Sequence, residues 1–156
     1  MKINIYYGGR GLLDDPTLYV IGKMENVLRE LRVKVERYNI YEHKNEIATL
    51  PQTFKDVDGI ILATTVEWLG IGGYMQQFLD ACWLYGDKEK IAQTYMQPIV
   101  MSTTYGEREV IQNIKCRIVQ QSPSTVINIY FHSIVSSLCC NCCFQYINFC
   151  SQNQYF

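Results

Sequence analysis

The stretch from Gly59 to Trp83 constrains the fold more than any other part of the chain. Residues 60–63 are an unbroken apolar run, which is typical of a strand that is covered on both faces, as in a parallel sheet. Residues 64–73 contain three glycines, two threonines and a tryptophan, so we expect a ten-residue loop that a ligand can approach closely. Helical spacing begins at Tyr74, with an apolar face made of Met75, Phe78, Leu79 and Cys82. This succession of strand, loop and helix predicts an open α/β sheet.

The N-terminal segment predicts a second unit of the same kind. Residues 2–7 form the expected first strand, and a glycine-rich turn follows at residues 8–11. Asp15 is a favourable helix N-cap and Pro16 a favourable first helical residue. The apolar stripe that follows predicts a helix to about Arg32.

Two further strands are expected, one at residues 33–38, where apolar and polar residues alternate, and one at residues 98–103, which are mainly apolar. Between them, residues 41–52 are polar and predict a loop with a short helical piece. Residues 88–97 predict a charged connection.

Three of the predicted turns carry glycine, threonine and aromatic residues: 8–11, 64–70 and 103–106. They follow the first, third and fourth strands. Because the carboxyl ends of parallel strands meet at one edge of a doubly wound sheet, we expect these three turns to lie together and to form a ligand site. Each turn taken alone has a simpler interpretation, as a tight glycine turn or an ordinary polar turn.

The central stretch resembles the flavodoxin-like fold, and within it the NAD(P)H-dependent FMN reductases and multimeric flavodoxins. Thr65-Val66-Glu67-Trp68 stands where that branch usually has Pro-Val-Tyr-Trp, and Phe78-Leu79-Asp80 matches the end of its helix. The chain departs from the pattern with Thr65 in place of proline and Glu67 in place of tyrosine. The resemblance covers about residues 1–110. It implies an α/β fold, a three-layer flavodoxin-like doubly wound parallel sheet of order 2-1-3-4-5, with an atypical or incomplete C-terminal part.

The resemblance also implies a cofactor, FMN, with NAD(P)H as co-substrate and a quinone, a flavin or a similar small molecule as electron acceptor. We expect the FMN phosphate near Gly9, Arg10 and Gly11, with Thr17 within reach, because exposed peptide N–H groups and a helix N-terminus favour anions. The other expected cofactor-binding residues are Thr64, Thr65, Val66, Glu67, Trp68, Gly70, Thr103, Thr104, Tyr105 and Gly106.

None of the three turns contains a set of side chains for nucleophilic catalysis, and nothing in residues 1–109 has metal-ligand spacing. We therefore assign no catalytic residue and expect the bound cofactor to carry the chemistry. Glu67 is expected beside the flavin ring, or alternatively as a solvated loop glutamate. Two other functions stay open: an electron carrier that binds FMN without oxidising NAD(P)H, and a flavodoxin-like scaffold, or a defective product, without cofactor.

The composition limits the classes of partner that this protein is expected to bind. A formal net charge of −1 and the lack of a basic stripe predict no nucleic-acid binding. The chain opens directly into a strand without a signal peptide, so we expect a cytoplasmic protein that does not bind membranes. The resembled family commonly forms dimers or tetramers. Residues 83–85 (Trp-Leu-Tyr) suit core packing, with a homodimer contact as the alternative.

The composition changes abruptly after Glu109, so residues 1–109 and 110–156 are treated as separate regions. All 15 acidic residues lie at or before Glu109, whereas six of the seven cysteines lie after residue 115. Residues 110–119 could form a helix and 125–135 a strand. Three interpretations of this tail stay open: a membrane span at residues 125–144, a metal site at Cys139, Cys140, Cys142 and Cys143, and the product of a shifted reading frame. We favour the last.

Overall fold

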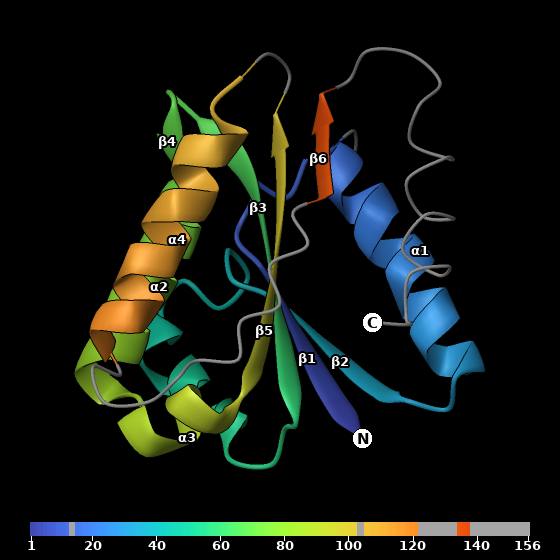
Figure 1. Ribbon diagram of the computed structural model, residues 1–156, viewed down its shortest axis with the longest axis vertical. Coiled ribbons are helices and arrows are strands. Elements are labelled where there is room, and N and C mark those ends of the chain that lie inside the picture. Colours follow the sequence, from blue (N-terminus) through green and yellow to red (C-terminus); the bar gives the residue numbers. More distant parts are fainter. Residues whose placement is uncertain (13–14, 103–104, 122–133, 138–156) are drawn as a thin grey trace, which may run out of the picture.

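The computed structural model describes residues 1–12, 15–102, 105–121 and 134–137, with side chains up to residue 118. Figure 1 shows a central sheet with helices on both sides. In chain order the elements are β1 (Lys2–Tyr7), α1 (Pro16–Glu30), β2 (Lys34–Asn39), η1 (Ile47–Phe54), β3 (Gly59–Glu67), β4 (Gly70–Ile71), α2 (Gly73–Tyr85), α3 (Lys88–Gln93), β5 (Tyr95–Ser102), α4 (Glu107–Gln121) and β6 (Ile134–Ser137).

The sheet has the order β2-β1-β3-β5-β6, and these five strands are parallel. The short strand β4 instead pairs antiparallel with the end of β3. Since β5 and β6 are the fourth and fifth strands of the parallel set, the expected order is confirmed. The register places Ile61 beside Ile5 on one side and beside Gln97 on the other.

Strand residues alternate between two hydrophobic clusters, as the two faces of a buried sheet require. Tyr6, Ile60 and Leu62 pack into a cluster with α2, η1 and α4, whereas Ile5 and Ile61 pack into a second cluster with α1. The layers are therefore α1 on one face and α2 with α4 on the other (Figure 1).

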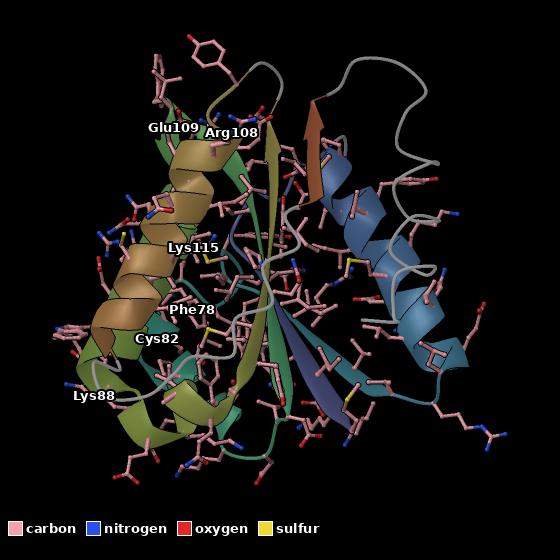
Figure 2. The ribbon with its side chains drawn as sticks, viewed as in Figure 1. Phe78, Cys82, Lys88, Arg108, Glu109 and Lys115 are labelled. Atoms are coloured by element: carbon pink, nitrogen blue, oxygen red, sulfur yellow. The ribbon has the colours of Figure 1, made fainter. Side chains whose placement is uncertain are left out.

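Helix α2 contributes its apolar face to the larger cluster, as its sequence predicts. Phe78 is fully buried and Cys82 nearly so, and both point from the helix toward the sheet (Figure 2). The Phe78 ring stacks on Tyr6, with 4.7 Å between ring centroids, and Tyr6 stacks on Tyr38 at 5.3 Å. Aromatic pairs at these distances each contribute about 0.5–1.5 kcal/mol beyond area burial.

Several element boundaries differ from the expectations. Strand β3 continues to Glu67, so the predicted loop at residues 64–73 is wrong over its first four residues. Thr64, Thr65 and Val66 are β-branched and extend the strand. The connection expected at residues 88–97 instead contains helix α3 and the start of β5, because the Asp87 side chain accepts hydrogen bonds from two backbone N–H groups and caps α3.

The described part of the second region joins the same core. Helix α4 runs from Glu107 to Gln121 and so crosses the position where the composition changes. Its buried side chains Val110, Ile111, Ile114 and Ile118 belong to the larger hydrophobic cluster. The four cysteines proposed as a metal site lie outside the described residues. Of the proposed membrane span, the structure describes only residues 134–137, which form β6. Among the helices that the structure describes, none is long and apolar enough to cross a bilayer.

Candidate functional site

The turn after β1 contacts the end of β3 and the start of α2. The Gly8 backbone N–H donates to the Ala63 carbonyl at 2.8 Å. A Cβ atom on Gly72 would lie 3.2 Å from both the Gly8 carbonyl oxygen and Thr64 Oγ1, which is tighter than ordinary contact. Glycine at position 72 therefore lets three segments of the chain approach one another at the sheet edge.

The turn after β5 reaches the same edge. Gly106 has a φ of 107°, which favours glycine, and a Cβ there would lie 2.9 Å from Val66 Cγ1 and 3.6 Å from Leu69 Cα. Its carbonyl accepts the first helical hydrogen bond of α4, from Val110. The structure thus brings the described parts of all three turns to one edge of the sheet, whereas Thr103 and Thr104 lie outside the described residues.

The Tyr7 side chain packs against the glycine-rich turn and hydrogen-bonds to it. Its hydroxyl donates to the Asp15 carboxylate and accepts from the Gly11 backbone N–H at 3.2 Å. A Cβ on Gly9 would overlap the Tyr7 ring, and Gly11, with a φ of 73°, lies against the Tyr41 ring. Burial, followed by the bond to Asp15, raises the pKa of Tyr7 above its ordinary value, so the phenol stays neutral.

The N-terminus of α1 is already occupied by the chain itself. Asp15 is the N-cap, and its Oδ1 accepts from the Thr17 N–H at 2.8 Å. Pro16 has no N–H to offer, and the Leu18 N–H binds the Asp15 carbonyl. The carboxylate also carries negative charge at the point where a phosphate would gain from the helix dipole. The helix end therefore does not fit a phosphate.

The glycine-rich turn itself fits an anion better. Within the described chain, the structure records no hydrogen bond from the backbone N–H groups of Gly9 and Arg10. The Arg10 guanidinium is more than half exposed at the same turn. Thr17 is fully buried, and its Oγ1 has no hydrogen-bond partner among the described residues. The two N–H groups and the guanidinium form a donor set that suits a phosphate at residues 9–10, whereas Thr17 is enclosed in the first turn of α1.

The hairpin between β3 and β4 borders this turn. Trp68 and Leu69 form its two-residue turn with φ values of 49° and 64°, so both lie in the left-handed region that bulky side chains disfavour. Glu67 precedes them and pairs with Arg10, with Nε and Oε1 3.1 Å apart. Such local strain is typical of functional segments.

Two exposed aromatic side chains stand at the rim of the edge. Trp68 is 95% exposed and Tyr105 is 64% exposed. The other predicted residues of β3 and β4 are less exposed. Thr64 is buried and its hydroxyl donates to the Thr65 carbonyl at 3.3 Å, and Thr65, Val66 and Gly70 are half-buried. Among the predicted site residues that the structure describes, the exposed aromatic side chains are thus Trp68 and Tyr105.

Sequence reasoning missed two side-chain pairs at this edge. The first is Tyr7 with Asp15, described above. The second joins Ser102, at the end of β5, to Glu107, at the start of α4: the Ser102 hydroxyl donates to the Glu107 carboxylate, and both residues are buried. A serine that ends an apolar run, followed by a glutamate on the first turn of the next helix, is the signal that was present for the second pair.

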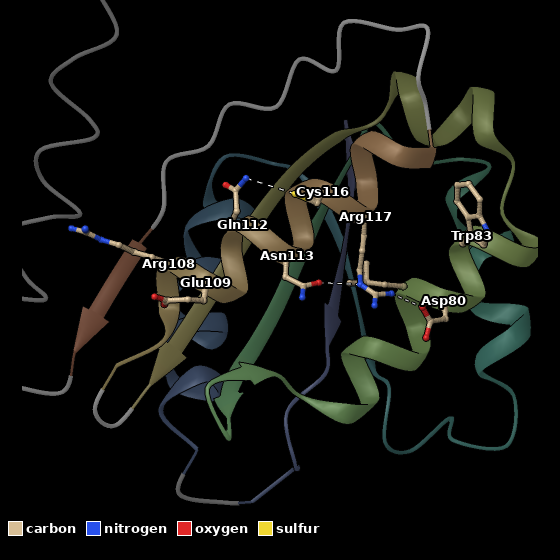
Figure 3. A pocket seen from close by; sticks show the side chains of 9 residues that line it. Asp80, Trp83, Arg108, Glu109, Gln112, Asn113, Cys116 and Arg117 are labelled. Atoms are coloured by element: carbon tan, nitrogen blue, oxygen red, sulfur yellow. Dashed lines mark hydrogen bonds and ion pairs between the residues drawn. The ribbon is translucent and has the colours of Figure 1, made fainter.

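A groove of about 920 Å³ lies elsewhere, on the outer face of α2 and α4. Figure 3 shows Asp80 and Trp83 on one wall and Arg108, Gln112 and Arg117 on the other, together with Glu109, Asn113 and Cys116. Arg117 crosses the groove and binds Asp80 at 2.5 Å. Among the described residues, no three metal-ligating side chains come together.

Trp83, Leu84 and Tyr85 are 46%, 66% and 59% exposed, so the interpretation of these residues as core packing is wrong. They follow the buried positions at the end of α2, and of the three only Trp83 lines the groove. The Lys88 ammonium lies 4.6 Å from the centroid of the Trp83 ring and covers part of it.

No family model matches the sequence, and neither does any curated protein. Solved structures with a similar fold are numerous. RosB with bound 8-demethyl-8-formylriboflavin-5′-phosphate is 12% identical with a TM-score of 0.68, over 90% of this chain and 67% of RosB. An NADH:FMN oxidoreductase (EMOB) is 11% identical with a TM-score of 0.63, over 86% of this chain and 74% of that protein. The NAD(P)H:quinone oxidoreductase from Methanothermobacter marburgensis is 10% identical with a TM-score of 0.65, over 97% of this chain and 92% of that protein. The strand order and these likenesses together show that the chain has the flavodoxin-like fold.

Proposed function

We propose that this protein is an FMN-binding oxidoreductase that takes electrons from NAD(P)H and passes them to a small-molecule acceptor. The observation that carries the proposal is the meeting of three strand-end turns at one sheet edge, with Arg10, Trp68 and Tyr105 around it. The proteins with a similar fold include an NADH:FMN oxidoreductase and an NAD(P)H:quinone oxidoreductase, which supports the assignment. We also propose a cytoplasmic location, where NAD(P)H is available.

Each turn has a distinct task in this proposal. The N–H groups of Gly9 and Arg10 and the Arg10 guanidinium bind the phosphate. Trp68 and Tyr105 cover the ring and exclude water from it, and the β3–β4 hairpin with Gly106 sets the distance between them. When bound, the flavin supplies acceptance of a hydride from NAD(P)H and transfer of the electrons to a quinone, a flavin or a similar acceptor.

The test is direct. The purified protein is titrated with FMN, and binding is followed by flavin absorbance and by quenching of flavin fluorescence. We expect saturable binding with one FMN per chain, and oxidation of NADH or NADPH in the presence of a quinone. Trp68→Ala, at a side chain that is 95% exposed and contacts little of the protein, should weaken FMN binding without lowering stability. Failure to bind added FMN would overturn the proposal, and binding without NAD(P)H oxidation would make the protein an electron carrier.

One specific observation favours a different function, a scaffold without cofactor. The Asp15 carboxylate caps the N-terminus of α1, and the Glu67 carboxylate forms an ion pair with Arg10. The chain's own carboxylates therefore neutralise two of the groups that would bind a phosphate. A protein that has lost its cofactor would keep such contacts permanently. The FMN titration above separates the two functions, because the scaffold would produce no saturable change in flavin absorbance or fluorescence at any FMN concentration.

We also propose that the protein forms a homodimer through the outer face of α2 and α4. Trp83 lines a groove with both charge signs there, and the adjacent Leu84 and Tyr85 also expose large apolar side chains at the end of α2. Under two-fold symmetry a mixed acidic and basic surface is complementary to itself. Analytical ultracentrifugation should show a dimer that Leu84→Asp converts to a monomer. Tyr19→Asp, at an equally exposed position on α1, is the matched control and should stay dimeric.

A further inference from the structure

One ion pair crosses the proposed site. Arg10 and Glu67 are 57 residues apart in the chain and join the glycine-rich turn to the β3–β4 hairpin, with Nε and Oε1 3.1 Å apart. The Glu67 side chain is 21% exposed and the Arg10 side chain 58% exposed, so the carboxylate is the more enclosed partner. Among the ion pairs of the described residues, no other joins two of the three strand-end turns.

The hairpin that Glu67 belongs to is held under local strain. Its two turn residues, Trp68 and Leu69, both have positive φ, a conformation that asparagine and glycine adopt far more readily. Its strand pairing is short, with only Val66–Ile71 and Glu67–Gly70 as partners. A strained turn on a two-residue ladder depends on outside contacts to keep its position. The bond from Glu67 to Arg10 is one such contact.

We propose that the Glu67 carboxylate holds the position on Arg10 that a phosphate monoester takes in the loaded protein, so that the Arg10–Glu67 pair is a latch opened by that phosphate. The inference rests on the proposed function, because the phosphate is that of the flavin cofactor. Carboxylates and phosphates bind a guanidinium through the same charge-assisted hydrogen bonds, and a phosphate carries more charge and more acceptor oxygens. The two anions repel each other, so a phosphate on Arg10 expels Glu67.

Two consequences distinguish this latch from a passive surface ion pair. The first is selectivity, because Glu67 competes with ligands that carry a phosphate and not with ligands that lack one. The second is movement, because exchange of Glu67 for phosphate removes the bond that ties the Trp68 hairpin to the glycine-rich turn. Entry of the phosphate and rearrangement of the ring-covering hairpin are then one coupled event.

The selectivity is tested by comparing FMN with riboflavin, which has the same ring and no phosphate. Glu67→Gln keeps the shape of the side chain and removes its charge. It should strengthen FMN binding by about 2- to 5-fold, the range of an exposed ion pair, and leave riboflavin binding unchanged. Arg10→Ala should weaken FMN binding by about 10-fold or more and leave riboflavin unchanged. Glu36→Gln makes the same charge change on β2 and should alter neither affinity.

The movement is tested without any flavin. In a Trp83→Phe background, Trp68 is the one remaining tryptophan of the chain, and its indole N–H gives a single NMR signal that reports on the hairpin. Inorganic phosphate should shift this signal saturably in the parent protein, and Arg10→Ala should abolish the shift. In Glu67→Gln the signal should start near its phosphate-bound position.

The outcomes separate the latch from the proposed function. An FMN-to-riboflavin affinity ratio that Glu67→Gln does not change, with FMN still bound, overturns the latch and leaves the oxidoreductase proposal standing. Absence of any flavin binding overturns the proposed function, and the phosphate titration then decides the latch by itself. A Trp68 signal that inorganic phosphate does not move, or moves equally in Arg10→Ala, also overturns the latch.

Discussion

Replacing Tyr7 with phenylalanine removes one oxygen atom from the base of the glycine-rich turn and should destabilise the protein by about 2 kcal/mol. The hydroxyl donates to the Asp15 carboxylate and accepts from the Gly11 N–H. A bond to a charged group contributes about 1.5–3 kcal/mol and a neutral one about 0.5–1.5 kcal/mol. Asp15 is only half-buried and can recruit water in the variant, so the lower end of the sum applies.

The assay is urea unfolding followed by far-UV circular dichroism, with thermal unfolding as a second measurement. A loss of about 2 kcal/mol in a domain of 156 residues corresponds to a fall in Tm of about 4–8 °C. The m-value should stay constant, because the change does not alter the surface exposed on unfolding.

Tyr41→Phe is the matched control. Tyr41 lies against the same turn, but its hydroxyl makes one exposed bond, to Glu42 at 2.8 Å. We expect that variant to lose no more than about 0.5 kcal/mol. If Tyr7→Phe is no more destabilising than Tyr41→Phe, the hydroxyl does not organise the turn and the described geometry of the site is wrong.

Three further predictions concern pH, packing and redox potential. Burial raises the pKa of both Tyr6 and Tyr7. The free energy of unfolding that their neutral forms contribute is therefore fully present below pH 10 and falls as the pH rises above it. Tyr6→Phe should make this fall shallower when the free energy of unfolding is measured in urea at several alkaline pH values. Phe78→Ala should cost about 3–5 kcal/mol, whereas Trp83→Ala, half-exposed on the same helix, should cost no more than about 1 kcal/mol; equal losses in calorimetry would contradict the assigned faces of α2. In the FMN-loaded protein, a Glu67 carboxylate that has been displaced from Arg10 toward the ring would disfavour a negative reduced flavin, so Glu67→Gln should raise the midpoint potential by roughly 20 mV. An unchanged spectroelectrochemical potential would place the displaced Glu67 away from the ring.

The fold could be predicted from short-range patterns because burial on both faces leaves an apolar run in the sequence. Residues 60–63 and 98–101 show this, and each lies inside a parallel strand of the structure. The start of α1 was also predictable, since an Asp-Pro pair caps a helix by local hydrogen bonding. These signals need only neighbouring residues, so one sequence is enough to find them.

The details of the site required contacts that sequence patterns do not carry. The Arg10–Glu67 pair joins residues 57 positions apart, and nothing in either turn specifies the other. The hairpin was hidden because its turn residues, Trp68 and Leu69, are poor formers of such turns, so no turn signal marks it. Tyr7 was counted only as a strand residue, since its hydroxyl partners lie in the turn and at the start of α1.

The path of α4 determines how short this protein can be made. A chain that stopped where its acidic residues end would lack the isoleucines at 111, 114 and 118, and the β-sheet surface that carries Leu62 and Val100 would be open to water on that side. Whatever reading frame encodes them, the residues from 110 to 118 are therefore as necessary to folding as those of the central strand. Trimming for crystals or for assays should begin beyond them.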